Sequence, residues 1–235
     1  ILRYVVARSK INRHIDFDTG SALFQTADEY ERLVSSDPEV GEGMSKRQIV
    51  AINTQRGALR LSQIKNGANP DDSLGGVSFR HLSMLAQIKS SDEDVWRSLR
   101  KSGHIVGSPT KSLKERLVRM RAWVEGNHFP EDSRLEIMDE IGEEALSNLS
   151  KSSISFLEQL SVLLSNCEWS ERGIENAIID SCEAAGITRR EGFSSIYWVL
   201  IGRENGPKAS SLISEIERAS VVKLLGSKDS RPSDA

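Results

Sequence analysis

Apolar residues recur every three or four positions along much of the chain, with polar residues between them. This spacing places apolar side chains on one face of a helix, where they can pack against a core. Four stripes of this kind stand out: Leu113, Leu117, Met120 and Val124; Ile154, Leu157, Leu160 and Leu164; Ile174, Ala177, Ile178, Cys182 and Ala185; and Phe193, Ile196, Tyr197, Leu200 and Ile201. The pattern predicts a mainly α protein whose last third is all-helical.

Short motifs predict where several helices begin and end. Thr188 and Glu191 fit a capping box, in which each side chain accepts a hydrogen bond from the other residue's backbone N–H. Gly186 is suited to end the preceding helix, because glycine adopts the left-handed conformation without strain. The acids of Asp92–Asp94 suit a helix N-terminus. Ser108–Pro109 fits an N-cap followed by proline at the first helical position.

The start of the chain has a different character. Ile1–Ala7 is an apolar run without a start methionine. It needs a partner surface, and we expect Tyr4, Val5 and Val6 to form an exposed apolar patch. Only residues 1–18 and a few that follow hold segments suited to short strands.

Charged residues follow this apolar run closely. Asp16 and Asp18 flank Phe17, so on a strand the two carboxylates would share one face. They could act as an acid and a base, but the simpler interpretation is that they anchor a neighbouring basic cluster through hydrogen bonds. That cluster consists of Arg8, Lys10, Arg13 and His14.

Composition divides the chain into regions. Residues 66–76, NGANPDDSLGG, form the clearest break. We therefore expect a first region over residues 1–76 and a helical domain over residues 77–226, with a subdomain break near 145–152. Residues 227–235 are polar and are expected to be a disordered tail.

Charge is distributed unevenly. The net charge of −3 argues against non-specific polyanion binding, although local charge can still form an RNA-binding surface. Residues 97–121 hold eight basic residues and one acid, whereas residues 131–144 hold seven acids and one arginine. This contrast indicates two surfaces with different uses, or only solvated helix faces. No apolar run approaches the roughly 18 residues that cross a bilayer.

The sequence contains no motif typical of a catalytic, phosphate-binding or metal-binding site. There is no phosphate-binding glycine motif and no Cys/His group with metal-ligand spacing, so we predict neither a catalytic residue nor a metal site. Gly43–Arg47 resembles a KMSKS motif only superficially, because the preceding lysine is missing. Cys167 and Cys182 lack CxxC spacing and are expected to be small buried side chains in a reducing compartment.

Four stretches, in the same order, resemble the class I (archaeal-type) lysyl-tRNA synthetases. They are RYVVARSKINRHIDFDTG through ADEYERL (3–33), FRHLSMLAQI with DEDVWRSLRKSGH (79–104), LVRMRAWVEG (117–126), and GFSSIYWVLIGRENGPKASSLI with ASVVKLLG (192–226). The resemblance implies a C-terminal fragment that begins just after the KMSKS loop. Two departures are Thr19, where the family usually has proline, and Asn205, where it usually has a basic residue.

The resemblance also implies a fold and partners. Residues 1–76 would form a stem-contact region with short strands, which follows the catalytic Rossmann domain. Residues 77–226 would form an α-helix cage that binds the anticodon arm of tRNA(Lys). ATP and Mg²⁺ would be used by the catalytic domain and not be bound by this chain, which should be inactive alone. The whole enzyme would be cytoplasmic.

Candidate contact residues fall into two groups. For RNA binding we propose Arg189, Arg190, Arg203, Lys208 and Trp198. Arg203 could instead cap its own helix, and Trp198 could face another helix. For bracing the KMSKS loop and contacting the tRNA stem, the resemblance points to Arg8, Lys10, Arg13, His14, Asp16 and Asp18.

Another class of function fits the same sequence. An all-helical, non-catalytic scaffold could use the acidic stretch 131–144 to bind a protein partner. Tight salt-dependent binding of tRNA would favour the first interpretation, and protein binding without RNA would favour the scaffold.

Overall fold

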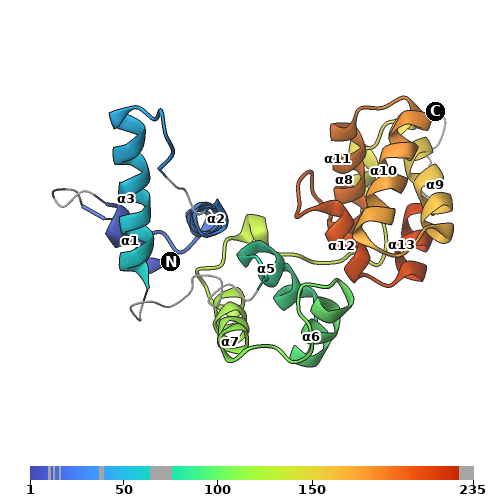
Figure 1. The fold of residues 1–235 in the computed structure, drawn as a ribbon. Helices are drawn as coiled ribbons and strands as arrows, with labels where there is room; N and C mark the ends of the chain where they lie inside the picture. Colours follow the sequence, from blue (N-terminus) through green and yellow to red (C-terminus); the bar gives the residue numbers. More distant parts are fainter. Residues whose placement is uncertain (10–11, 13, 16, 37–39, 64–75, 228–235) are drawn as a thin grey trace. The chain divides into compact units, whose positions relative to one another are not determined.

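The computed structural model describes residues 1–9, 12, 14–15, 17–36, 40–63 and 76–227. These residues form twelve α-helices, one short 3-10 helix and no strand (Figure 1). The prediction of a mainly α fold is therefore confirmed. Contacts divide the chain into two compact units, Ile1–Arg134 and Leu135–Ala235.

The predicted regions do not map simply onto these units. The break expected at residues 66–76 lies almost wholly outside the described residues, as does the tail from residue 228 onward. The subdomain break near 145–152 includes the end of one helix and the start of the next. All three boundaries stay predictions.

The first unit contains six of the α-helices and the 3-10 helix. They are α1 (Leu2–Arg8), α2 (Ser21–Ser36), α3 (Lys46–Ser62), α5 (Phe79–Ile88), α6 (Asp92–Lys101), α7 (Lys111–Glu125) and η1 (Glu131–Ser133). α1 packs against α3, α2 against α3 and α5, and α5 against α7.

The expectation of a strand was wrong for residues 2–8, which form α1. Valine and tyrosine favour strands, but a strand would place Tyr4 and Val5 on opposite faces. In the helix both side chains are buried, with 7% and 8% of their surface exposed. The expected apolar patch is also corrected, since only Val6 of the three residues is exposed.

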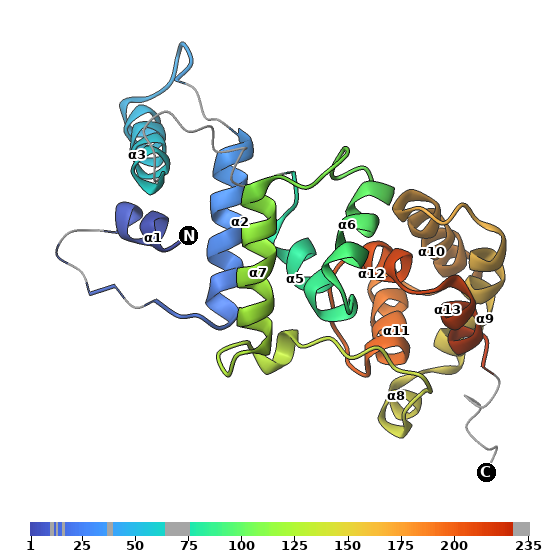
Figure 2. The same ribbon diagram turned by 90° about the horizontal axis from the view of Figure 1, so that it is seen from below.

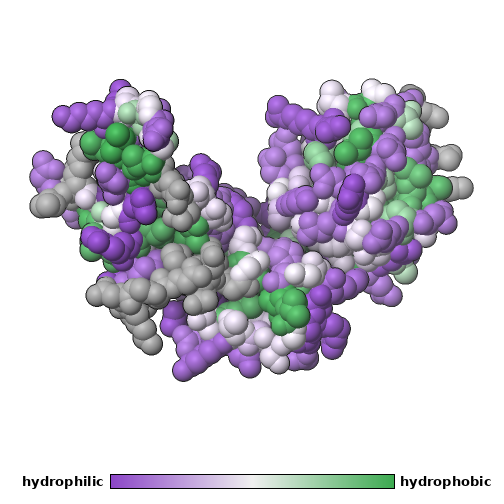
Figure 3. Space-filling model, viewed as in Figure 1, coloured by the Kyte–Doolittle hydropathy of each residue, from purple (hydrophilic) through white to green (hydrophobic). Residues whose placement is uncertain are grey.

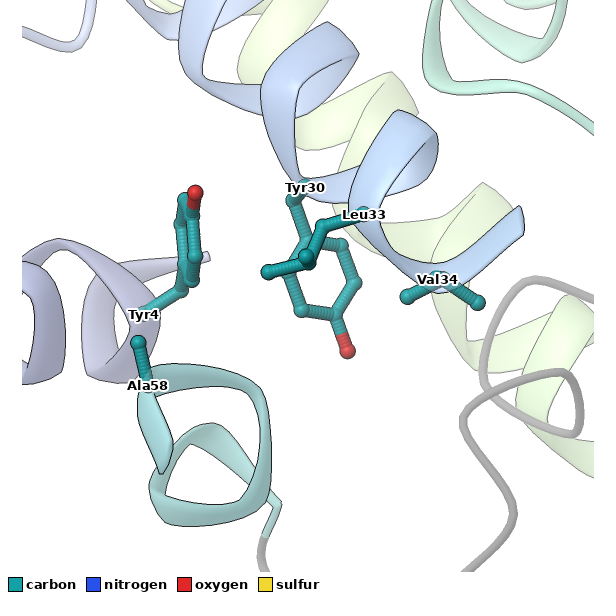
Figure 4. Packing of buried hydrophobic residues seen from close by; sticks show 5 residues of the cluster. All are labelled: Tyr4, Tyr30, Leu33, Val34 and Ala58. Atoms are coloured by element: carbon teal, nitrogen blue, oxygen red, sulfur yellow. The ribbon is translucent and has the colours of Figure 1, made fainter. Parts of the chain in front are cut away.

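A small core joins the first three helices. Figure 4 shows Tyr4 of α1 and Ala58 of α3 facing α2, which contributes Tyr30, Leu33 and Val34. The rings of Tyr4 and Tyr30 meet edge to face, with 5.4 Å between their centroids. An edge-to-face aromatic pair adds about 0.5–1.5 kcal/mol beyond its buried area. This contact attaches α1 to a helix that is distant in the sequence.

A second core lies between α2, α5 and α7. Phe24, Phe79, Trp123 and Phe129 form a group of rings whose centroids are 4.7–6.3 Å apart. Buried leucines of α5, α6 and α7 extend this core: Leu82, Leu85, Leu99, Leu113 and Leu117.

The start of α7 differs from its prediction. The N-cap is Thr110, whose side-chain oxygen accepts a 3.2 Å hydrogen bond from the Leu113 N–H. Ser108 and Pro109 lie before the helix. The threonine hydroxyl satisfies an N–H of the first turn, so proline at the first helical position is not needed.

The second unit contains the other six helices. They are α8 (Glu143–Asn148), α9 (Lys151–Asn166), α10 (Glu171–Ala185), α11 (Arg189–Ile201), α12 (Ala209–Glu215) and α13 (Arg218–Leu225). α9 packs against α10, α11 and α13, and α10 also packs against α12 (Figure 2). The predicted stripes supply much of the core, including Leu160, Leu164, Ile174, Ile178, Ile196 and Leu200, and Phe156 and Leu212 add to it.

A glycine allows three of these helices to approach closely. Gly192 is a buried residue of α11. A Cβ atom on it would lie 2.5 Å from the Cys182 sulfur of α10 and 3.2 Å from the Phe156 ring of α9. Only a residue without a side chain fits this position, because packed cores tolerate little added volume.

We expect Gly192→Ala to destabilise the second unit by about 1–3 kcal/mol, because the methyl group overlaps two buried side chains. Urea unfolding would measure the loss. Gly57→Ala is the control, since Gly57 lies inside α3 and a methyl group there would have no atom within 4 Å. This control should be neutral or stabilising by about 0.5–1 kcal/mol. Equal stability of Gly192→Ala and the native chain would contradict the packing argument.

Candidate nucleic-acid interface

The N-terminus of α11 is fixed by the predicted capping box. The Thr188 hydroxyl accepts a 3.2 Å hydrogen bond from the Glu191 N–H, and the Glu191 carboxylate accepts a 2.8 Å hydrogen bond from the Thr188 N–H. The hydrogen bonds that the Thr188 N–H and hydroxyl donate to this carboxylate lower the pKa of Glu191. The box presents Arg189 and Arg190 on the first turn, where both are exposed and form no ion pair with a described residue.

The C-terminus of α11 is held by a folded loop. Gly202 adopts a left-handed conformation (φ 65°), and its N–H donates to the Trp198 carbonyl at 3.2 Å. The Tyr197 hydroxyl donates to the Pro207 carbonyl at 2.5 Å. Burial raises the pKa of Tyr197, so this hydroxyl keeps its proton and stays a donor. The loop from residue 202 to 208 is therefore tied back onto its own helix.

Arg203 and Lys208 are both carried by this loop. Arg203 is partly exposed, and Trp198 on the helix before it is also partly exposed. The Leu200 carbonyl at the helix end already accepts a 2.9 Å hydrogen bond from the Met138 N–H. Helix capping and RNA contact both remain compatible with the position of Arg203.

Lys208 has partners that the sequence did not indicate. Its ammonium lies 3.1 Å from Glu175 and 3.3 Å from Glu171, both on α10. The hydrogen bond to Glu175 is the main cause that raises the pKa of Lys208. An RNA phosphate would have to compete with two carboxylates for this cation.

The five RNA-binding candidates do not form one cluster. Trp198, Arg203 and Lys208 lie at or near the C-terminal end of α11, whereas Arg189 and Arg190 lie at its N-terminal end. A 13-residue helix is about 20 Å long. One RNA strand would need to run along α11 to contact both ends.

The candidates near the N-terminus are only partly described. Lys10, Arg13 and Asp16 lie outside the described residues. Arg8 forms an ion pair with Glu29 of α2 and lies over the Tyr4 ring, and His14 is exposed.

Asp18 forms part of a turn that leads into α2. Its carboxylate accepts a 2.7 Å hydrogen bond from the Gly20 N–H. The neighbouring Thr19 carbonyl accepts a 2.9 Å hydrogen bond from the Trp123 indole. Asp18 therefore shapes this turn through a backbone contact. The anchoring of the basic cluster by Asp16 and Asp18 stays a prediction.

Half of the eight basic residues in the stretch 97–121 form ion pairs in the folded chain. Four arginines pair with acids of α6 and α7: Arg97 with Asp94, Arg100 with Glu93, Arg119 with Glu115 and Arg121 with Asp92. A fifth, Arg116, donates to the Val77 carbonyl at 3.0 Å. This stretch is therefore less available to a polyanion than its composition indicates.

Sequence reasoning passed over a different group of basic residues. α3 carries Lys46, Arg47, Arg56 and Arg60, and all four are exposed. The signal was present, because residues 43–63 contain no acid at all. This segment lacks a clear apolar stripe, so its basic helix did not stand out in the sequence. Only Ala58 of α3 is buried.

Metal sites and membrane spans are absent from the described part of the chain. Among these residues, no group of three or more His, Cys, Asp or Glu side chains could hold a metal ion. No described helix is both long and apolar enough to span a membrane. Cys182 is buried as predicted, whereas Cys167 is partly exposed.

We expect Gly206→Ala to disturb the loop that carries Arg203 and Lys208. A methyl group at Gly206 would lie 2.8 Å from the Tyr197 ring and from the Ile201 side chain. Overpacking of this kind costs about 1–3 kcal/mol, which urea unfolding would detect. Asn205→Ala, at the exposed neighbouring residue, should leave stability unchanged. A stable Gly206→Ala protein would show that the loop is not tied to Tyr197.

Comparison with known proteins gives a consistent set of relatives. No protein-family model matches the chain. It is 25% identical to a lysine–tRNA ligase of Picrophilus torridus over 227 residues, which cover 97% of this chain and 42% of that protein. Lysine–tRNA ligases of Pyrococcus horikoshii (27%; 96% and 42% covered) and Methanopyrus kandleri (26%; 96% and 40%) are similar. The chain spans about two fifths of these relatives. It is distantly homologous, over nearly its whole length, to part of the archaeal lysine–tRNA ligases.

Proposed function

We propose that this chain is the tRNA-binding, anticodon-recognising part of a lysine–tRNA ligase. The observation that carries the proposal is the similarity over 97% of the chain to only 42% of such a ligase. The sequence contains no HIGH or KMSKS element. Recognition of tRNA(Lys) is the role left for a part of the ligase that lacks these elements.

Two regions would divide this work. Residues 1–76 would join the catalytic Rossmann domain, brace its KMSKS loop and contact the tRNA stem. Residues 77–226, which include the second unit, would bind the anticodon arm. The catalytic domain would use ATP and Mg²⁺ to activate lysine, in the cytoplasm, and this chain would orient the tRNA for transfer.

The second unit has side chains suited to a single-stranded RNA loop. Unstacked bases can lie on aromatic rings and on guanidinium planes. Trp198 is partly exposed on α11, Arg203 follows it in the loop, and Arg189 and Arg190 are exposed at the other end of the helix. Lys208 would contribute only where phosphate displaces Glu171 and Glu175.

We expect Arg203→Ala to weaken binding of a tRNA(Lys) transcript. If Arg203 contacts a phosphate, the slope of log K against log salt should fall by about 1. Fluorescence anisotropy at several salt concentrations would measure the slope. Lys223→Ala is the control, because Lys223 is an exposed basic residue of the same unit. Unchanged affinity with a lowered melting temperature would assign Arg203 to helix capping.

Two companion variants probe the rest of α11. Arg189→Ala/Arg190→Ala should lower the slope by about 2 if both contact phosphates. Trp198→Ala should cost about 1–3 kcal/mol, mainly with the cognate anticodon, if the indole stacks on a base. If the native chain binds no tRNA but captures a protein partner through residues 131–144, the scaffold function would replace this proposal.

We expect no lysine-dependent exchange of pyrophosphate into ATP by the purified chain. Formation of an adenylate requires positioned groups that stabilise the charge developing on the phosphate, and the sequence lacks the motifs that supply them. The assay compares the chain with a no-protein blank and with an intact archaeal lysine–tRNA ligase. Activity above the blank would contradict the assignment of catalysis to another part of the ligase.

A further inference from the structure

Lys208 lies at the junction between the loop that carries Arg203 and the start of α12. The helix does not stabilise this cation, because the dipole at a helix N-terminus favours an acid and Lys208 occupies the N-cap position. Its side chain is 57% exposed, so solvent alone would be enough to accommodate the charge. The side chain instead contacts two acids of α10, the helix against which α12 packs.

The two acids are spaced to hold one cation between them. Glu171 and Glu175 are four residues apart on α10, so their side chains project from the same face of the helix. The Lys208 ammonium lies 3.3 Å from the first carboxylate and 3.1 Å from the second. The hydrogen bond to Glu175 is the main cause that raises the pKa of Lys208, so the ammonium stays charged. One positive and two negative charges leave this group of three negative as a whole.

The backbone on both sides of Lys208 is held independently of these ion pairs. The Tyr197 hydroxyl donates a 2.5 Å hydrogen bond to the Pro207 carbonyl and accepts one from the Ala209 N–H. Gly206 lies so close to the Tyr197 ring that a Cβ atom on it would be 2.8 Å away. The Lys208 side chain can therefore change its partner while the loop keeps its shape.

The ion pairs themselves add little to the stability of the second unit. All three side chains are partly exposed, and solvent and salt screen ion pairs of this kind. Their main effect is on the charge that the loop offers to a ligand, because an RNA phosphate gains Lys208 only by displacing the carboxylates. Figure 3 shows hydrophilic side chains around this loop, in the view in which Figure 1 labels α11 and α12.

We propose that Glu171 and Glu175 form an autoinhibitory contact with Lys208, which weakens RNA binding by the loop between α11 and α12 and speeds the release of bound RNA. This inference rests on the proposed function and adds to it a means of releasing tRNA. The two carboxylates compete with the phosphate and regain the ammonium whenever the phosphate moves away. Product release limits the turnover of many enzymes, so a ligase that must release each charged tRNA benefits from such a competitor.

The first test removes both carboxylates. Glu171→Gln/Glu175→Gln should bind a tRNA(Lys) transcript roughly five- to eightfold more tightly at 0.1 M salt, because one added phosphate contact contributes a salt slope of about 0.7–0.9. The slope of log K against log salt should therefore steepen by about 1. Stopped-flow fluorescence should place most of the change in the dissociation rate, as is usual for variants of one interface. Weaker binding would show that the acids position Lys208 for RNA and would overturn the proposal.

A matched variant controls for the change in net charge. Glu158→Gln/Asp180→Asn also removes two exposed acids, from α9 and α10, and neither acid forms an ion pair with a described residue. This variant should bind the transcript within about twofold of the native chain, because exposed charges away from the RNA are screened by salt. An equal gain in both variants would assign the effect to net charge and overturn the autoinhibitory contact.

The gain in affinity should also depend on Lys208. In a Lys208→Ala background, Glu171→Gln/Glu175→Gln should leave the affinity and the dissociation rate unchanged, because no cation remains to be released. A gain of the same size without Lys208 would mean that the acids only repel RNA, and the proposal would fail. Thermal unfolding of each variant shows that it is folded, and the double glutamine variant should melt close to the native chain because Tyr197 holds the loop.

The outcomes separate this inference from the proposed function. If the native chain binds no tRNA, both fail. If it binds tRNA(Lys) and the double glutamine variant binds and releases it equally, only the autoinhibitory contact is overturned. A double glutamine variant that binds more weakly and melts at a lower temperature would show that the ion pairs fasten α12 to α10, which would also overturn the proposal.

Discussion

The carboxylate of Glu31 is a polar contact that links three helices of the first unit. It lies on α2 and accepts a 2.6 Å hydrogen bond from the Phe79 N–H at the start of α5, with the Arg116 guanidinium of α7 nearby. Burial is the largest effect and raises the pKa of Glu31. The folded state therefore holds this proton more tightly than the unfolded chain does. Taken alone, Glu31 therefore lowers the free energy of unfolding of the first unit as the pH rises through its raised pKa.

A buried charge of this kind makes the arrangement specific. The aromatic rings of Phe24, Phe79 and Trp123 attract α2 to α5 and α7 without fixing a precise register. The Glu31–Phe79 hydrogen bond is directional, and breaking it would leave a half-buried carboxylate without its donor. Arg80 and Asp28, 2.8 Å apart at the surface, repeat the α2–α5 link in a more exposed position. Apolar contact thus brings these helices together, and polar contacts set how they pair.

The sequence predicted features that depend on near neighbours. Gly186 and the Thr188–Glu191 box lie where their helices end or begin, because capping joins residues within one turn. The failures involve residues far apart in the chain. Tyr4 of α1 packs against Tyr30 of α2, and Lys208 pairs with Glu171 and Glu175. For the candidate site, the α11 capping motifs were foreseeable from sequence, whereas the availability of each cation was not.

The contrast between near and distant contacts also applies to the charged residues that could bind RNA. Residues 97–121 have a basic composition, yet the fold pairs Arg97, Arg100, Arg119 and Arg121 with acids on α6 and α7. α3 has fewer cations, and none of them forms an ion pair with a described residue. A phosphate gains more from a cation that has no carboxylate to give up, because the existing ion pair must be broken first. The capacity to bind a polyanion therefore follows from charges that the fold leaves uncompensated. The absence of acids from residues 43–63 is visible in the sequence, whereas a pair between distant residues such as Arg121 and Asp92 is visible only in the folded chain.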